Sequence, residues 1–229
     1  MHPILGSVAG VRVYTFSATL LAAIAMAVGV VWDEARRRSL PARLWWQLAA
    51  AATAAGLVGA RLWSLVHAGG RGGLVWYGGV AAGALAVWVV TTLRRVRWLD
   101  AADAIAPALA AGLAIGRVGC HLAGDGDWGP PTTLPWGVRY AAGVASWPFP
   151  PGVYVHPSAL YEAAASAVLC MALRGRAVAF WWWCVGAGTV RFLVELVRVE
   201  PVIACGLTEA QALGVLLVAV GLVGVSGRP

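Results

Sequence analysis

Three arginines, Arg61, Arg117 and Arg191, interrupt long apolar segments of the sequence. An unpaired charge inside a bilayer costs about 2.5 kcal/mol or more, so each needs a partner or a function. Arg191 and Glu195 are four residues apart, which on a helix permits a buried ion pair. Arg117 lies in residues 116–119, GRVG, where the glycines allow close approach to the backbone. Its guanidinium could anchor at the interface or grip a phosphate through two hydrogen bonds.

Two histidines flank a polar segment and are candidate general bases. His121 begins residues 121–156 and His156 ends them. An imidazole titrates near neutral pH and can take the proton of a reacting group. The alternatives are that His121 is an interfacial side chain and that His156 caps or packs at a helix start. Asp125 and Asp127 alternate with glycines, which is more typical of a turn than of a catalytic base.

The elements that position these residues are predicted to be membrane helices. Of 229 residues, 60% are hydrophobic and 12% charged, whereas a soluble domain carries about 25% charged residues. A helix in lipid needs about 20 mainly apolar residues. We therefore expect an all-α integral membrane protein, one polytopic domain over residues 1–229, with a long outer loop between helices four and five. The seven expected transmembrane helices are residues 13–32, 45–66, 74–93, 101–120, 157–173, 177–197 and 207–225.

The distribution of basic residues predicts the orientation. All seventeen are arginine, and they do not form one patch, so nucleic acid is not an expected partner. Most lie in the loops after helices one, three and five, whereas the opposite side holds Arg12, Arg71, Arg139 and Arg198. The positive-inside rule places the N-terminus outside and the C-terminus in the cytoplasm. The four cysteines are widely spaced without a CxxC pair, so no metal, cofactor or disulfide framework is expected.

Several segments together resemble one membrane-enzyme family. Residues 116–140, GRVGCHLAGDGDWGPPTTLPWGVRY, are similar to the signature of prolipoprotein diacylglyceryl transferases, GRxGNFxNxExxG followed by PWG. The opening around Tyr14 resembles the family's first helix, and residues 59–62 resemble its GARL segment. Residues 156–162, HPSALYE, resemble HPxQLYE, and residues 190–195, VRFLVE, resemble FRFxxE. The motifs follow the family's order, and its topology of seven helices with the N-terminus outside is the one expected here.

The resemblance implies an activity and its partners. The family moves a diacylglyceryl group from phosphatidylglycerol to the thiol of a lipobox cysteine in a lipoprotein precursor, in the bacterial inner membrane, and releases glycerol phosphate. The reacting thiol, with a pKa of about 8.5, must lose its proton, and the phosphate leaving group must be stabilised. By the motif matches, the expected phospholipid-binding residues are Tyr14, Arg61, Arg117, Gly129 and Arg191.

The chain departs from the family pattern at the usual catalytic base. The family's His-Gly-Gly at the start of helix three reads Tyr77-Gly78-Gly79. A tyrosine, with a pKa of about 10, is a poor replacement for a histidine base. The catalytic candidates are therefore His121, His156 and Tyr77, and we favour His121, because it could face the same phosphate as Arg117 if helix four continues one more turn. The alternatives are a non-catalytic phospholipid- or lipoprotein-binding paralogue and, less favoured, a small transporter.

Overall fold

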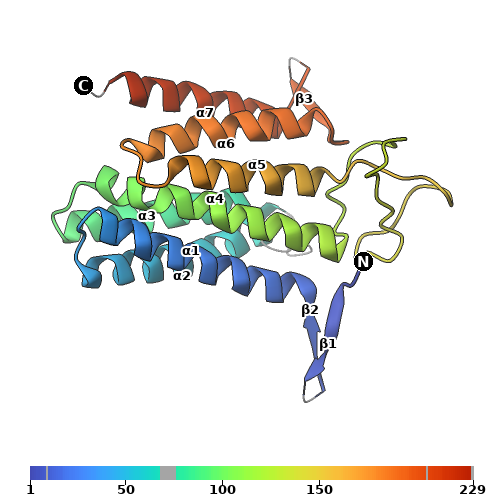
Figure 1. Cartoon of the computed structure of the whole chain (residues 1–229), viewed down its shortest axis with the longest axis horizontal. Helices are drawn as coiled ribbons and strands as arrows, with labels where there is room; N and C mark the ends of the chain where they lie inside the picture. The colour runs from blue at the N-terminus through green and yellow to red at the C-terminus, as the bar shows by residue number, and fades with distance from the viewer. Residues whose placement is uncertain (9, 68–75, 205, 228–229) are drawn as a thin grey trace.

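The computed structural model describes residues 1–8, 10–67, 76–204 and 206–227, and each expected apolar segment contains one helix of a bundle (Figure 1). The helices are α1 Thr15–Arg37, α2 Ala42–His67, α3 Trp76–Leu93, α4 Trp98–Ala123, α5 Ser158–Leu173, α6 Ala179–Glu195 and α7 Glu209–Ser226. Among the described residues, α1, α2, α4 and α7 are long and apolar enough to cross a membrane. The chain is thus a mostly helical, multi-pass membrane protein.

Two short β-hairpins correct the expectation of an all-α chain. Both hairpins lie next to helix ends. Their strands are only two to five residues long, which is too short for an alternating pattern to distinguish strand from helix. The first hairpin turns at Gly10, whose φ of 79° suits glycine, and its second strand includes residues 13 and 14, which we expected in helix one. The pairs are β1 Ile4–Val8 with β2 Val11–Tyr14, and β3 Val202–Ala204 with β4 Leu207–Thr208.

The helices pack mainly as neighbouring pairs around α4. Helix α4 contacts α1, α5 and α6, while α2 packs on α3 and α6 packs on α7. Small residues let α2 and α3 cross closely: a Cβ atom added at Gly59 would overlap the carbonyl oxygen of Gly78, and one added at Gly78 would overlap that of Gly59. Glycine is therefore required on both helices, as is common where membrane helices touch through their backbones.

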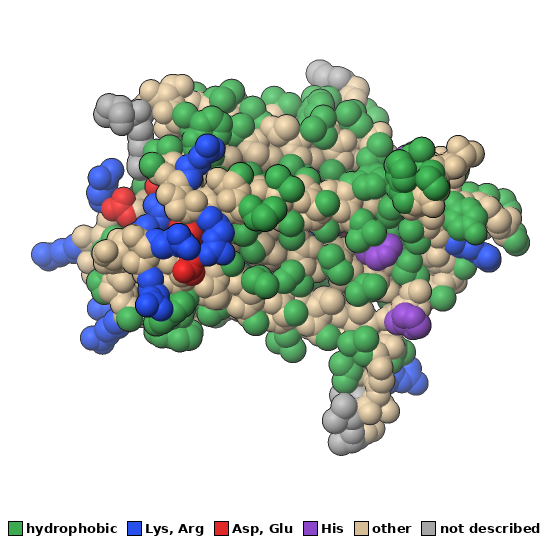
Figure 2. Space-filling model, viewed as in Figure 1, with side chains coloured by type: hydrophobic (Ala, Val, Ile, Leu, Met, Phe, Trp, Pro, Cys, Tyr) green, Lys and Arg blue, Asp and Glu red, His purple; other side chains and the backbone are tan. Residues whose placement is uncertain are grey.

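The two ends of the bundle differ in charge. The loops α1–α2, α3–α4 and α5–α6 lie at the same end as the last turn of α7, and the first residues and the segment after α4 lie at the other end (Figure 1). Most basic side chains visible in Figure 2 gather at the first of these ends. Two buried carboxylates bind backbone there: Glu34 accepts from the N–H of Gly175 at 3.0 Å, and Asp103 accepts from that of Phe180 at 2.8 Å.

Candidate active site

Arg117 projects from the last turns of α4 toward two carboxylates at the end of the bundle that carries the long loop. Its Nη1 pairs with Oδ2 of Asp127, and its Nε lies 2.9 Å from Oε2 of Glu162 on α5. The Arg117 side chain is 17% exposed and that of Glu162 only 4%. The guanidinium is therefore held by opposite charges and is not a plain anchor in the lipid headgroups.

Arg191 lies between two carboxylates in the same way. Its Nη2 is 2.9 Å from Oε2 of Glu195, four residues further along α6, so the expected pair with Glu195 is confirmed. Its Nη1 is 3.5 Å from the same Glu162 oxygen that faces Arg117. Glu162 thus joins the two arginines that the sequence singled out, from a third helix.

Arg198 closes these contacts into a ring. It follows α6, its side chain is 7% exposed, and its Nη2 pairs with Oδ1 of Asp127 while its Nε lies 3.8 Å from Oε2 of Glu195. We call the six residues the arginine–carboxylate ring, in which each arginine faces two ring carboxylates and each carboxylate faces two arginines. Nη2 of Arg198 also lies 2.8 Å from Oε1 of Glu200, which is outside the ring. The ring consists of Arg117, Asp127, Arg198, Glu195, Arg191 and Glu162.

The alternation of charge explains how six ionisable groups fit at the end of a membrane bundle. A buried charge is costly unless it is paired and hydrogen-bonded, and three cations with three anions sum to no net charge. A further hydrogen bond supports the ring from the start of α7, because the hydroxyl of Thr208 donates to Oε1 of Glu195 at 2.9 Å. The result is a set of fixed guanidinium groups in a partly buried site.

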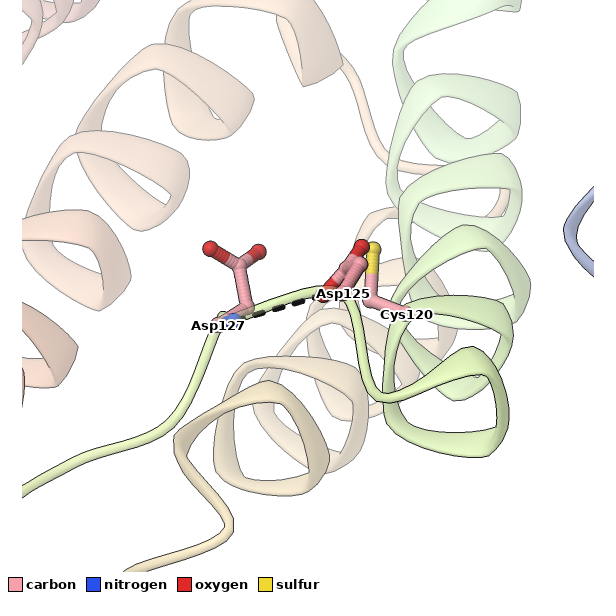
Figure 3. Close-up of side chains that lie close together, drawn as sticks. All are labelled: Cys120, Asp125 and Asp127. Atoms are coloured by element: carbon pink, nitrogen blue, oxygen red, sulfur yellow. Dashed lines mark hydrogen bonds between the residues drawn. The ribbon is translucent and has the colours of Figure 1, made fainter. Parts of the chain in front are cut away.

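The turn after α4 carries Asp127 into the ring. Gly124 ends the helix in the left-handed conformation, with φ of 63°. The carboxylate of Asp125 then accepts a hydrogen bond from the backbone N–H of Asp127 at 3.3 Å (Figure 3), so Asp125 does shape the turn as expected. Asp127 takes part in the turn through its backbone N–H, and its side chain forms ion pairs with Arg117 and Arg198, which the sequence did not predict.

A thiol and two carboxylates meet beside this turn. Cys120, Asp125 and Asp127 place their ligand atoms within 4.8 Å of one another, with Asp125 next to the Cys120 sulfur (Figure 3). Such donors could hold a metal ion. However, both oxygens of Asp127 already face guanidinium groups, whose positive charges oppose a cation at this place.

Helix α4 continues to Ala123, so His121 lies in its last turn. This continuation is the condition under which His121 was favoured as the base. Its Nδ1 is 2.8 Å from the hydroxyl oxygen of Tyr140. Burial raises the pKa of Tyr140, so this hydroxyl stays protonated at neutral pH. Trp128, the residue after Asp127, stacks on Tyr140 with ring centroids 5.3 Å apart. In the tautomer whose Nδ1–H donates to the Tyr140 oxygen, Nε2 of His121 carries no hydrogen and is the candidate proton acceptor.

His156 belongs to a second hydrogen-bond network. Its Nδ1 lies 3.1 Å from the hydroxyl of Tyr161, which also accepts a hydrogen bond from Nε1 of Trp136 at 2.8 Å. Tyr161 directly precedes Glu162, so this network adjoins the ring. The backbone carbonyl of His156 accepts from the N–H of Gly129 at 2.9 Å. His156 therefore ties the long segment to the first turns of α5.

Comparison with known proteins identifies the family. The chain matches the family described as prolipoprotein diacylglyceryl transferase over residues 3–226. It belongs to this family. Relatives named phosphatidylglycerol–prolipoprotein diacylglyceryl transferase include one from Cupriavidus metallidurans, 32% identical over 166 residues, or 67% of this chain and 58% of the relative. One from Nitratidesulfovibrio vulgaris (strain Miyazaki F) is 36% identical over 172 residues, or 66% of this chain and 59% of the relative.

A third relative of the same name, from Zymomonas mobilis, is 33% identical over 169 residues, or 66% of this chain and 56% of the relative. The chain therefore spans less than two thirds of the length of the curated transferases that it matches. The family assignment rests on the match along nearly the whole chain, whereas the activity requires a separate argument from the site.

The other residues matched to transferase motifs lie outside the ring. Tyr14 ends β2 at the start of α1 and is 49% exposed. Arg61 is exposed on α2. Tyr77 belongs to the first turn of α3, and its side chain lies outside the part of the chain that the structure describes. Arg117 and Arg191 are thus the two predicted phospholipid-binding residues that the structure brings together.

Gly129, the last glycine of the transferase signature, is a site of close packing. A Cβ atom there would overlap the carbonyl oxygen of Val197 and would lie 2.9 Å from the Cβ of His156. Any side chain would therefore push away the segment that carries Arg198. Gly129 helps to position the ring through the backbone, which is compatible with the expected role near the phospholipid.

The sequence reasoning missed three ring members. Asp127 was assigned to a turn, Arg198 was counted only as a loop charge, and Glu162 was noted only within the HPSALYE motif. One signal was present: Arg198 follows Glu195 by three residues, a spacing that allows a contact if the helical path continues. The contacts of Asp127 with Arg198, 71 residues apart, leave no such trace in the sequence.

Proposed function

We propose that this protein transfers a diacylglyceryl group from phosphatidylglycerol to the thiol of a lipobox cysteine in a lipoprotein precursor. One observation carries the proposal: Arg117 and Arg191, from the two family motifs, converge on Glu162 in a partly buried site. Guanidinium groups fixed in this way favour the negative charge that develops on a leaving phosphate. The partners are then phosphatidylglycerol and the precursor peptide, and the expected location is the bacterial inner membrane.

The proposed reaction is a displacement at the glyceryl carbon that carries the phosphate. The thiol proton passes to a base, and the sulfur then forms a C–S bond as the C–O bond to phosphate breaks. Glycerol phosphate leaves with the bonding electron pair, and Arg117 and Arg191 stabilise its charge. His121 is the favoured base, in the tautomer whose Nδ1–H donates to the Tyr140 oxygen and leaves Nε2 to accept the proton; His156 and Tyr77 are the other candidates.

The proposed topology is a single polytopic domain over residues 1–229 with seven transmembrane helices. The N-terminus and the residues between α4 and α5 face outward, and the C-terminus faces the cytoplasm. Support comes from the basic loops, which lie at the opposite end of the bundle from the ring (Figures 1 and 2). The site would then open toward the side on which secreted precursor peptides emerge.

The test is transfer by the purified protein. The detergent-solubilised protein is incubated with phosphatidylglycerol and a lipobox peptide, and the peptide mass is measured. We expect a gain of one diacylglyceryl group, absent when the peptide cysteine is serine or when diacylglycerol replaces phosphatidylglycerol. Binding of the lipid without any mass gain would instead favour the non-catalytic paralogue, which the Tyr77 replacement of the family histidine also suggests.

A further inference from the structure

Asp127 bridges two arginines in the way that a phosphate would. Its Oδ2 faces Nη1 of Arg117, and its Oδ1 faces Nη2 of Arg198. Two non-bridging oxygens of a phosphate diester could take the same two positions, because arginine binds carboxylate and phosphate with similar geometry. The carboxylate and the phosphate of the substrate would therefore compete for the same donors.

The other two carboxylates of the ring are fixed more firmly. Glu162 and Glu195 project from helices, their side chains are 4% and 1% exposed, and Glu195 also accepts from Thr208. Asp127 lies on a loop, and its side chain is 24% exposed. Its backbone carbonyl is held by the hydroxyl of Ser158 at 2.9 Å. The Asp127 side chain can therefore turn outward while the loop stays in place.

The ring also leaves one donor of Arg117 unsatisfied. Its Nε is buried and has no hydrogen-bond partner among the described residues, although Glu162 lies close enough for an ion pair. A buried donor without a partner is costly, so another acceptor beside this guanidinium is favoured. A phosphate has more acceptor oxygens than the carboxylate that it would replace.

We propose that Asp127 is a displaceable counter-ion, which the phosphate of phosphatidylglycerol replaces between Arg117 and Arg198. The inference rests on the proposed function. Before the lipid binds, Asp127 holds the guanidinium groups of Arg117 and Arg198 in the positions that the phosphate will need. Its side chain returns to them when glycerol phosphate leaves. Asp127 is thus a positioning residue that weakens lipid binding and speeds product release, and Arg198 is a third arginine of the phosphate site.

The experiment compares Asp127→Asn with Asp125→Asn, a matched control on the same turn that retains the turn-forming oxygen. Binding of phosphatidylglycerol in detergent micelles and of soluble glycerol phosphate is measured separately, so that a lipid site is distinguished from a site for free phosphate. We expect Asp127→Asn to bind phosphatidylglycerol at least about fivefold tighter, because a charge that repels phosphate is gone. Arg198→Ala should bind about tenfold weaker. The control removes a neighbouring charge outside the ring and should tighten binding clearly less than Asp127→Asn does.

Transfer kinetics in the same preparations distinguish displacement of Asp127 by the phosphate from a purely structural role of Asp127. In Asp127→Asn the KM for phosphatidylglycerol and kcat should both fall, since product release slows; a purely structural role would not lower KM. Unchanged or weaker lipid binding by this variant overturns the displacement. Tighter binding of glycerol phosphate alone overturns it too. Absence of transfer by the wild type overturns only the proposed function. If Asp127→Asn does not fold, Asp127→Ser carries the same expectation.

Discussion

Single side chains of the ring can be removed without leaving any other member unpaired. Each of its six residues has at least two partners, so the loss of Arg117 leaves Asp127 with Arg198 and Glu162 with Arg191. Removing one partner of an isolated buried ion pair costs about 3–5 kcal/mol, and the closed ring reduces this cost. Function and stability can therefore be separated by substitutions at this site.

The first prediction is that Arg117→Ala and Arg191→Ala each lower transfer about a hundredfold or more, as the loss of a fixed donor at a developing charge does. Both variants should remain folded in the membrane for the reason just given. Replacement by Lys should restore little, because an ammonium cannot bind two phosphate oxygens as a planar fork does. The measurement is peptide mass gain at equal protein amount, with Arg12→Ala, on the exposed hairpin, as control.

Wild-type rates in both Ala variants would refute the phosphate role of these arginines. A loss of membrane abundance together with activity would show that the ring is needed for folding, contrary to the argument from its closure.

The second prediction concerns the base. His121→Gln should abolish transfer, and His156→Gln should retain part of it, because His156 is bound within its own network with Tyr161. Only the neutral imidazole accepts a proton, so wild-type transfer should rise with pH as the imidazole loses its proton and then level off. Tyr140→Phe should lower the rate less than His121→Gln, since it removes only the hydrogen bond that orients the His121 imidazole. The pH profile of each variant is the measurement.

If neither Gln variant loses transfer, no histidine of the long segment is the base. Should the wild type be inactive and Tyr77→His gain activity, the chain would be a lipid-binding paralogue that has lost its base.

At the scale of elements, the crossing of α2 and α3 joins two family segments that are apart in the sequence. Gly59 belongs to the GARL segment and Gly78 to the segment that carries Tyr77. Their backbones touch, as the overlap of any added Cβ atom shows. The close approach sets where the first turn of α3 lies relative to Arg61, so packing between these helices positions two of the residues assigned by the motifs.

The third prediction follows from this crossing. Gly59→Ala and Gly78→Ala should each destabilise the protein by about 1–3 kcal/mol, because the added methyl group meets backbone that cannot move aside. Gly29→Ala on α1 is the control, since no described atom lies within 4 Å of a Cβ there, and it should not lower stability. Thermal unfolding in detergent is the measurement. Equal melting temperatures for all three variants would contradict the close crossing.

At the scale of the whole molecule, the two ends of the helix bundle carry different kinds of charged residues. Basic loops gather at the end with the last turn of α7, and the ring is near the other end with the hairpin β1–β2 (Figures 1 and 2). The six ring charges cancel within the ring, and the proposed orientation rests on the loop arginines at the other end. Under the proposed function and topology, orientation and lipid recognition would use different arginines.

The fourth prediction tests that orientation. A reporter fused after Arg228 should be active in the cytoplasm, and one inserted near Gly143 should be active outside. Gly143 is in the segment between α4 and α5, at the opposite end of the bundle from the basic loops. Paired reporters that depend on opposite compartments give the measurement. A reversed pair of signals would overturn the topology and place the site on the cytoplasmic side.

The sequence by itself determined the helices and the two motif arginines. Apolar length and the clustering of arginines are properties of consecutive residues, so the seven segments, and the pair Arg191 with Glu195, could be predicted from spacing alone. Helix four was expected to end at Cys120, and its continuation to Ala123 entered the sequence argument only as a condition for His121. The hairpins were missed, because short apolar strands next to apolar helices lack a distinct pattern.

Only the tertiary structure decided which charges meet. Glu162 lies 29 residues before Arg191, and Asp127 lies 71 residues before Arg198, yet each pair is in contact. Such contacts depend on how α4, α5 and α6 pack and on the direction in which the turn after Gly124 leaves its helix. Hydrophobic burial chooses that packing without regard to sequence distance. The carboxylates that hold the two motif arginines were therefore visible only once the bundle was assembled.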